Sequence, residues 1–268
     1  MSLFRQHAKS EAISVIVWAV SIGLVTFFAT CMWNVLRASG ELAELQKAID
    51  QAQGVIRGML GPGASLLSID GWIQGYVLGS WTSVLWVIFT AMFVVGMITR
   101  EMDRRTIEFV LSRPISRARL LLARWGVLAL SLVFMHLVQF VGLWSALATL
   151  GQVGHLGRYA VAEVNSLLLY LFLGGLMLLV SLYFDDYGPG TGAILGIGLA
   201  LNLAHMALAD ATGGLKKLRE LLPFSLYDVQ AIISKGTVPW AHLVILGSGA
   251  LLFLLLSVWL FERKQIAV

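Results

Sequence analysis

The sequence predicts an all-α polytopic membrane protein, and its composition and its hydrophobic pattern both support this fold class. Hydrophobic residues make up 58% of the 268 residues, charged residues make up 13%, and the mean hydropathy is +0.83. Average soluble domains carry about 25% charged residues, so a soluble fold of this size could not cover its surface with polar groups. The apolar runs do not alternate with period two, which excludes barrel strands and leaves helices.

Six apolar segments are long enough to cross a bilayer as helices. We expect these spans at residues 12–36, 77–99, 120–150, 161–184, 191–208 and 241–261. The third is longer than a bilayer requires, so it should tilt or project beyond the membrane. The sequence contains no internal repeat, low-complexity tract or flexible linker. We therefore expect residues 1–268 to form a single transmembrane domain.

The basic residues predict the orientation of the spans. With the N-terminus placed inside, the inner segments hold eleven Lys and Arg residues and the outer segments hold eight. Their density is decisive, because seven arginines lie between Arg100 and Arg124, directly after the second span. The inner loop at residues 185–190 carries no basic residue and mildly opposes this assignment. We expect a multi-pass protein of the plasma (inner) membrane with both termini in the cytoplasm.

Three stretches outside the spans are amphipathic or apolar. Residues 3–8 favour a short interfacial helix on the inner leaflet. In residues 37–76, apolar residues at helical spacing predict an amphipathic helix that stops near Gly61. The residues with this spacing are Leu42, Leu45, Ile49 and Ile56. Residues 211–240 contain apolar stretches with prolines, so we expect re-entrant or interfacial helices before the sixth span.

The segment between the second and third spans carries a pattern that membrane topology alone does not require. Residues 100–119 read REMDRRTIEFVLSRPISRAR. Apolar residues up to Val110 share one face of a helix, whereas charged residues of both signs lie around the other faces. Pro114 disfavours helical geometry in the residue before it, and Ser116 can cap the following span. From these residues, a docking helix along the membrane and an ordinary topogenic loop both remain open interpretations.

The same segment resembles the coupling-helix region of ABC-2 type transporter permeases. The pattern of that region is roughly E-x3-G-T-x-E-x-L-L-x-x-P-[IV]-[ST]-R. The matching residues are Glu101, Thr106, Glu108, Leu111, Pro114, Ile115, Ser116 and Arg117. Arg105 stands where the family has glycine, and Val110 replaces the first leucine of the pair. The six spans and the long last outer loop are also similar to the subfamily with one permease domain per chain.

This resemblance implies the transmembrane subunit of an ABC exporter, not an enzyme. It implies a homodimer of permeases in membrane lipid, docked on a cytosolic ABC ATPase dimer that binds ATP and Mg²⁺. The expected ATPase-docking residues are Glu101, Arg104, Arg105, Thr106, Glu108, Phe109, Arg113, Pro114 and Arg117. The chain has no G-x-x-x-x-G-K-[ST] phosphate loop, and we expect it to bind no cofactor, metal or nucleic acid itself. The expected cargo is a lipid, peptide, antibiotic or other amphiphile.

Two pairs of polar residues lie inside the expected spans. His136 and Gln139 belong to the third span, and Asn202 and His205 belong to the fifth. Each pair has i, i+3 spacing, so its members share one face of a helix. They are candidates for a substrate path or a dimer seam, and hydrogen bonding between the helices of one subunit is the alternative.

A membrane enzyme and a non-transporting assembly or maturation subunit are the competing function classes. The sequence contains neither an H-E-x-x-H zinc motif nor a G-x-S-x-G nucleophile motif. The acids nearest to the spans all fall close to the span ends instead of pairing inside the membrane. These acids are Glu163, Asp185, Asp186 and Asp210. The pattern disfavours catalysis and leaves the assembly subunit as an open alternative.

Overall fold

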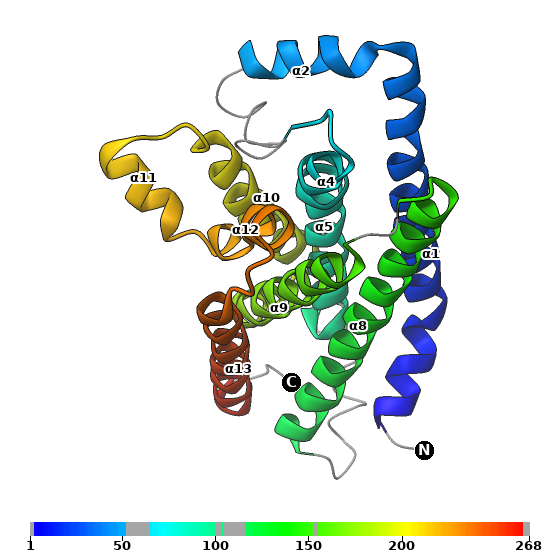
Figure 1. Ribbon diagram of the computed structural model, residues 1–268. Coiled ribbons are helices and arrows are strands. Elements are labelled where there is room, and N and C mark those ends of the chain that lie inside the picture. Colours follow the sequence, from blue (N-terminus) through cyan, green and yellow to red (C-terminus); the bar gives the residue numbers. More distant parts are fainter. Residues whose placement is uncertain (1–2, 52–64, 100–102, 104–115, 153–154, 265–268) are drawn as a thin grey trace.

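Long apolar helices form the frame of the structure, a computed structural model (Figure 1). The structure describes residues 3–51, 65–99, 103, 116–152 and 155–264. This part of the chain contains no β-strand, and six of its helical segments are long and apolar enough to cross a membrane. They are Phe4–Ser39, Ile69–Met97, Arg117–Thr149, Leu156–Ser181, Tyr187–Ala207 and Trp240–Arg263. Each overlaps one of the six expected spans, which confirms the all-α polytopic fold.

The first helix, α1 (Leu3–Ser39), is continuous over 37 residues. The N-terminal residues that we expected to form a separate interfacial helix are its first turns. The reason is that no glycine or proline precedes Gly23, so no residue there favours a break. Gly40, with a φ of 82°, ends α1 and redirects the chain. The following helix, α2 (Glu41–Gln51), crosses the end of the bundle (Figure 1).

The amphipathic helix expected after the first span is partly described as α2. On this helix the side chains of Leu42 and Ile49 are buried, whereas the side chain of Leu45 is exposed. Ile56 and the expected stop near Gly61 lie outside the described residues. The helix therefore presents an apolar face to the bundle, as its spacing predicts.

The second span begins eight residues earlier than we expected. It consists of α4 (Ile69–Trp72), the π-helical η1 (Ile73–Trp81) and α5 (Thr82–Met97), joined without a break. Ser68 caps its start, because its hydroxyl accepts a hydrogen bond from the Gly71 amide at 3.1 Å. Polar side chains in these additional residues make hydrogen bonds inside the fold. Gln74, for example, accepts a hydrogen bond from the Ser234 hydroxyl at 3.0 Å.

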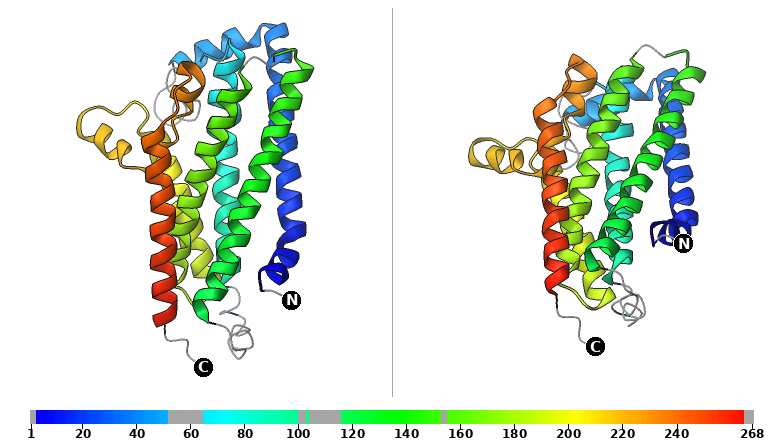
Figure 2. Two further views of the ribbon diagram at one scale, coloured as in Figure 1. Left: turned by 60° about the horizontal axis from the view of Figure 1, so that its bottom comes forward. Right: turned by 90° about the horizontal axis from the view of Figure 1, so that it is seen from below.

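The third helix, α8 (Arg117–Thr149), packs along α1. Its 33 residues give a length of about 50 Å, more than the ~30 Å hydrocarbon core. The two helices approach each other at glycines, since a Cβ atom on Gly142 would lie 2.4 Å from the Gly23 carbonyl oxygen. Small residues at such a crossing let two membrane helices come into backbone contact. Figure 2 shows α1 and α8 side by side along the bundle.

The remaining long helices complete the bundle. They are α9 (Leu156–Ser181), α10 (Tyr187–Ala207) and α13 (Trp240–Arg263), and α9 packs against both α5 and α13. The start of α1 and the end of α13 lie at the same end of the bundle (Figure 2). We call this the terminal end, and we call the opposite end, which α2 crosses, the far end.

Three short helical elements lie between the fifth and sixth spans, where we expected interfacial or re-entrant helices. They are α11 (Gly213–Glu220), η2 (Pro223–Leu226) and α12 (Val229–Lys235). Proline at the first position of η2 fits a helix start, where its missing N–H costs no hydrogen bond. The α12 element is anchored to α9, because the Arg158 guanidinium donates to the Ile233 carbonyl at 2.9 Å. In contrast, α11 stands out from the side of the bundle (Figure 2).

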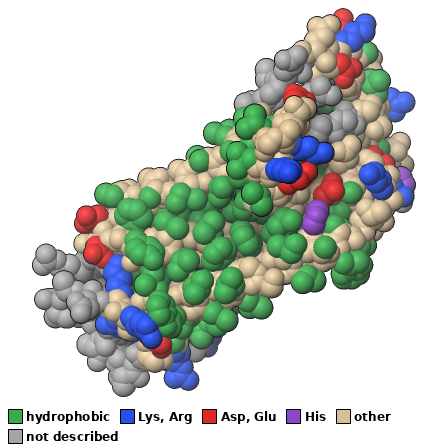
Figure 3. All heavy atoms as spheres, turned by 90° about the vertical axis from the view of Figure 1, so that its left-hand side faces the viewer, with side chains coloured by type: hydrophobic (Ala, Val, Ile, Leu, Met, Phe, Trp, Pro, Cys, Tyr) green, Lys and Arg blue, Asp and Glu red, His purple; other side chains and the backbone are tan. Residues whose placement is uncertain are grey.

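Exposed apolar side chains form a belt around the helices. Figure 3 shows hydrophobic side chains over the middle of one face, with charged side chains gathered toward its two ends. On α1, Ile13 and Phe28 are 77% and 64% exposed, and on α13, Leu251 is 61% exposed. A soluble protein would not expose so continuous an apolar surface, whereas a bilayer accommodates it. The protein is a multi-pass membrane protein.

Candidate functional site

A polar cluster lies inside the bundle, between α5, α8 and α9. The Trp86 indole N–H donates to the Gln139 side-chain carbonyl at 2.9 Å, and the Trp86 ring stacks on His136 with centroids 3.8 Å apart. His136 Nδ1 lies 2.9 Å from the Leu132 carbonyl, and its Nε2 lies 3.2 Å from the Ser166 hydroxyl. Because the carbonyl only accepts, a neutral ring donates from Nδ1 and accepts the Ser166 proton at Nε2. His136 and Gln139 thus make hydrogen bonds that join three spans of one chain.

A second polar layer connects α5 with α9 and α10. The Asn202 amide donates to the Ser83 hydroxyl at 3.2 Å, and the Tyr170 hydroxyl donates to the Ser83 carbonyl at 3.2 Å. Asn202, Ser83 and Tyr170 are all buried. Inside a bilayer such bonds fix the relative position of helices, because an unsatisfied polar group there is costly. Sequence reasoning selected Asn202 but missed Ser83, whose small hydroxyl gives no distinctive signal within an apolar run.

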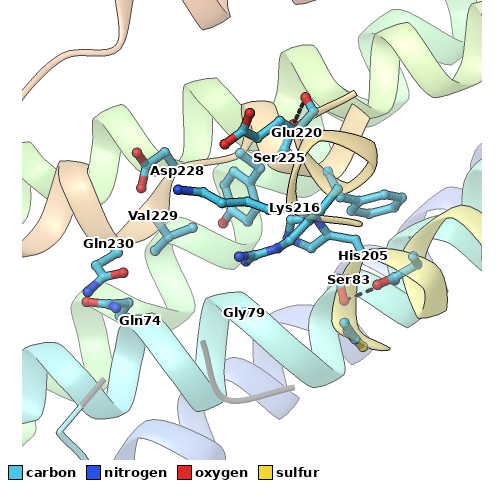
Figure 4. Close-up of a pocket in the computed structure, with 15 residues that line it drawn as sticks. Gln74, Gly79, Ser83, His205, Lys216, Glu220, Ser225, Asp228, Val229 and Gln230 are labelled. Atoms are coloured by element: carbon cyan, nitrogen blue, oxygen red, sulfur yellow. Dashed lines mark hydrogen bonds between the residues drawn. The ribbon is translucent and has the colours of Figure 1, made fainter. Parts of the chain in front are cut away.

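A cavity of about 320 Å³ opens next to this second layer, between η1, α10, α11, η2 and α12. We call it the α11 cavity. Ser83, Asn202 and His205 line it from the spans, and Gln74 and Tyr227 line it from η1 and the connection between η2 and α12 (Figure 4). The structure therefore brings the polar pair of the fifth span to a cavity and leaves the pair of the third span in the closed cluster.

Charged residues complete the lining of the α11 cavity. Lys216, Arg219 and Glu220 line it from α11, and their i, i+3, i+4 spacing places them on one face of that helix. Asp228 lines it from the start of α12, where its carboxylate accepts a hydrogen bond from the Ala231 amide at 2.9 Å. The described residues form no ion pair between these four side chains. Their charges are therefore available to a ligand, although Asp228 and Arg219 each also make a hydrogen bond to the backbone.

Behind the cavity wall, α9 carries a buried acid. Glu163 is only 6% exposed, and in the described part of the chain its Oε1 atom has no hydrogen-bond partner. Burial raises the pKa of the nearby Tyr227 phenol, the Glu163 carboxyl raises it further, and a hydrogen bond with Ser166 lowers it. The Tyr227 hydroxyl also lies 3.4 Å from the Leu78 carbonyl. Tyr227 thus lines the cavity as a neutral hydrogen-bonding group close to Glu163.

At the terminal end, three charged residues connect the starts and ends of three spans. The Arg117 guanidinium donates to the Phe261 carbonyl at 3.3 Å and also to the Lys264 carbonyl. The Lys264 ammonium donates to the Leu182 carbonyl at 2.6 Å and lies 2.7 Å from an Asp185 carboxylate oxygen. We call Arg117, Asp185 and Lys264 the terminal clasp. It joins the start of α8 to the end of α13 and to the connection between α9 and α10.

The expected docking segment borders this clasp. Its residues Glu101, Arg104, Arg105, Thr106, Glu108, Phe109, Arg113 and Pro114 lie outside the described residues, as does the helix expected there. Its last member, Arg117, is the first residue of α8, and Ser116 caps that helix by accepting from the Arg119 amide at 3.3 Å. Within the segment, Asp103 accepts a hydrogen bond from the Tyr187 amide, at 3.3 Å, at the start of α10. Described contacts therefore connect both ends of the segment to the spans.

The family model described as ABC-2 family transporter protein matches residues 3–266, nearly the whole chain. This chain belongs to the ABC-2 transporter family. The permease matches no protein in a search of curated proteins. Members of the family are transmembrane subunits of ABC transporters that work with an ABC ATPase partner and typically lack an ATPase of their own.

Sequence reasoning found only part of the permease's candidate site. Asn202 and His205 were detectable because polar residues inside an apolar span are rare. Lys216 and Arg219 were missed, because charged residues in a loop usually face solvent. A signal was present in residues 213–220, where leucines and charged residues alternate with helical period beside the membrane.

Proposed function

We propose that the permease exports an amphiphile across the plasma membrane, driven by a cytosolic ABC ATPase dimer that docks on residues 100–117. In this scheme ATP and Mg²⁺ bind to the ATPase subunits, and the permease binds no cofactor or metal. The family match supports a permease of an ABC transporter. The resemblance of residues 101–117 to a coupling-helix region supports the docking surface.

The observation that carries this proposal is the pair of contacts at the two sides of the docking segment. Asp103 contacts the amide of Tyr187, and Arg117 belongs to the terminal clasp. A displacement of the segment by closing ATPase subunits would therefore act directly on α8, α10 and α13. A ligand or partner shifts a conformational equilibrium only through contacts that differ between states, and the nucleotide-dependent ATPase surface supplies that difference.

One helix links the docking segment to the α11 cavity. α10 begins at Tyr187, beside Asp103, and carries Asn202 and His205 toward its other end. Asn202 lies 15 positions after Tyr187, which is about 22 Å along a helix at 1.5 Å per residue. A rigid helix of this length would transmit a movement across most of the ~30 Å hydrocarbon core. ATP-driven motion at the docking segment would thereby change the cavity.

Orientation and assembly are part of the same proposal. We place the terminal end in the cytoplasm, because the dense arginines border the second and third spans there. A homodimer is inferred from the similarity to permeases with one permease domain per chain. Each copy would dock on one ATPase subunit, which gives the complex two coupled halves.

Co-purification tests the docking surface. The double variant Glu101→Lys, Glu108→Lys reverses two charges of the segment, and it should lose the ATPase when the permease is purified from its native membrane. The matched control is Glu44→Lys, which reverses an exposed charge on α2 at the far end and should retain the ATPase. Membrane fractionation verifies insertion of both variants. If the double variant retains the ATPase as well as the wild type does, the docking proposal fails.

A further inference from the structure

In the described part of the chain, two buried nitrogen atoms of residues that line the α11 cavity have no hydrogen-bond partner. These atoms are His205 Nδ1 and Arg219 Nε. The Arg219 guanidinium holds its position through a bond from Nη1 to the Ala209 carbonyl at 3.3 Å, and it acts electrostatically on His205. The two nitrogen atoms therefore belong to neighbouring side chains that line one cavity. An anionic oxygen between them would accept from Arg219 Nε–H and from His205 Nδ1 in the tautomer that carries its proton there.

Lys216 adds a second full positive charge to this donor pair. It lies one turn from Arg219 on the same face of α11, and in Figure 4 its side chain extends across the cavity between Asp228 and His205. A phosphate group offers several anionic oxygens and is well matched to guanidinium and ammonium donors. The donor set favours a phosphate over an uncharged polar group.

The cavity also contains two acids, which make an anion alone a poor fit. Glu220 and Asp228 line it, so its two cations are balanced by two carboxylates. Asp228 and His205 lie on opposite sides of the cavity in Figure 4. A zwitterion with a phosphate at Arg219 and an ammonium group near Asp228 would place each of its charges beside an opposite charge. Repulsion from the same acids would weaken a purely anionic head group.

The outer face of α11 favours a lipid as the source of this head group. Leu215, Leu218 and Leu221 are 56%, 50% and 81% exposed, whereas three of the four charged residues of the helix line the cavity. α11 also stands out from the bundle, so its leucines can lie among acyl chains at the membrane surface (Figure 2). A lipid could keep its head group in the cavity and its tails against these leucines.

We propose that the α11 cavity binds the phosphate and ammonium groups of a zwitterionic phospholipid such as phosphatidylethanolamine. Arg219, His205 and Lys216 would bind the phosphate, and Asp228 and Glu220 would bind the ammonium group. This inference rests on the proposed function, because it names the cargo class of the exporter. The binding step itself needs neither the ATPase nor ATP.

Lipid titration tests this proposal. Tail-labelled phosphatidylethanolamine is titrated into the delipidated full-length permease in detergent, and Kd is measured for the wild type and three variants. Arg219→Gln and Lys216→Gln should each weaken binding about tenfold, the loss typical of one charge-assisted contact. Lys217→Gln removes a neighbouring charge of α11 that does not line the cavity, so its Kd should be unchanged. Lys216→Gln keeps the test valid if Arg219→Gln disturbs the turn at Ala209.

Two further ligands distinguish the sources of phosphate. Phosphatidylglycerol, which has the phosphate but no ammonium group, should bind about tenfold more weakly than phosphatidylethanolamine. Inorganic phosphate should compete only at far higher concentration. Equal Kd values for the wild type, Arg219→Gln and Lys216→Gln would overturn the site, and equal Kd values for the two lipids would overturn the zwitterion. Saturable binding of inorganic phosphate without binding of either lipid would overturn the lipid source.

The same Arg219→Gln sample separates this inference from the docking proposal. Arg219 takes no part in the described contacts of Asp103 and Arg117, so the variant should still co-purify with the ATPase. If the wild-type permease binds both lipids with equal Kd and still co-purifies with the ATPase, only the cavity inference is rejected. If the lipids bind with the expected Kd values but no ATPase co-purifies with the wild-type permease, only the docking proposal is rejected.

Discussion

The Lys264 ammonium lies 2.7 Å from the Asp185 carboxylate and ties the end of α13 to the connection between α9 and α10. The two residues differ in environment, because the Asp185 side chain is 74% exposed and the Lys264 side chain is 14% exposed. An ion pair with one exposed partner contributes little to stability, roughly 0–1 kcal/mol. Its effect should therefore appear in the coupling between helices and not in the folding equilibrium.

Replacing Asp185 tests this separation of coupling from stability. Asp185→Asn should leave the apparent unfolding temperature of the permease unchanged and lower the cargo-stimulated ATPase activity of the reconstituted complex. The reason is that α13 would no longer follow movements of the connection between α9 and α10. Asp186→Asn is the control, since Asp186 is also exposed and its side chain makes no cap hydrogen bond to α10. Equal ATPase activity in both variants would contradict a coupling role.

The glycine contact between α1 and α8 should be sensitive to a single methyl group. In Gly142→Ala, the new Cβ atom would lie 2.4 Å from the Gly23 carbonyl oxygen, so the helices must separate. We expect a loss of about 1–3 kcal/mol, the usual cost of overpacking, seen as a lower apparent unfolding temperature in detergent. Gly157→Ala is the control, because a Cβ atom there meets nothing within 4 Å. An unfolding temperature unaffected by Gly142→Ala would show that the crossing is not tightly packed.

The buried Trp86 should matter through its hydrogen bond as well as through its volume. Trp86→Phe keeps an aromatic ring beside His136 but removes the donor that satisfies Gln139. Leaving a buried acceptor unsatisfied costs about 1–3 kcal/mol, so the apparent unfolding temperature should fall. Trp144→Phe supplies the comparison, because Trp144 is 48% exposed on the apolar belt and should tolerate the change. Similar shifts in both variants would mean that ring volume, not the hydrogen bond, is responsible.

Alkaline pH should expose the environment of Tyr227. Its raised phenol pKa means that the folded protein binds a proton that the unfolded chain releases near pH 10. Stability from this group is therefore fully present below about pH 10 and is lost as the pH rises above that value. Between pH 9 and pH 11, the wild type should lose more thermal stability than Tyr227→Phe. Tyr183→Phe, at a tyrosine that is 71% exposed, should behave as the wild type does.

The fold was predictable because the bilayer imposes a simple rule on sequence. Each span needs a long apolar run, and such runs remain visible whatever the tertiary contacts are. The expected second span omitted residues 69–76, which include the charged Asp70. In the structure, Asp70 accepts a hydrogen bond from the Tyr159 hydroxyl, and its other oxygen lies 3.0 Å from His155 Nδ1. These partners lie more than 80 residues away in sequence, so the local pattern could not reveal them.

The candidate site was predictable only where polarity itself was unusual. His205 stood out within an apolar span, but nothing near it in the sequence indicates that Arg219 returns to the same cavity. The terminal clasp depends in the same way on Lys264 reaching Asp185, 79 residues away. Membrane-spanning periodicity predicts helices, whereas the meeting of loop charges is decided by how the helices pack.

The orientation of the bundle can be tested with single cysteines in a Cys31→Ser background. Glu44 is exposed on α2 at the far end, and Gln6 is exposed in the first turns of α1 at the terminal end. In intact cells, a membrane-impermeant maleimide should label Glu44→Cys from outside and should reach Gln6→Cys only after permeabilisation. The expectation follows from the arginines that border the terminal end, which are retained on the cytoplasmic side. The reverse labelling pattern would place the docking segment outside the cell, where no cytosolic ATPase could reach it.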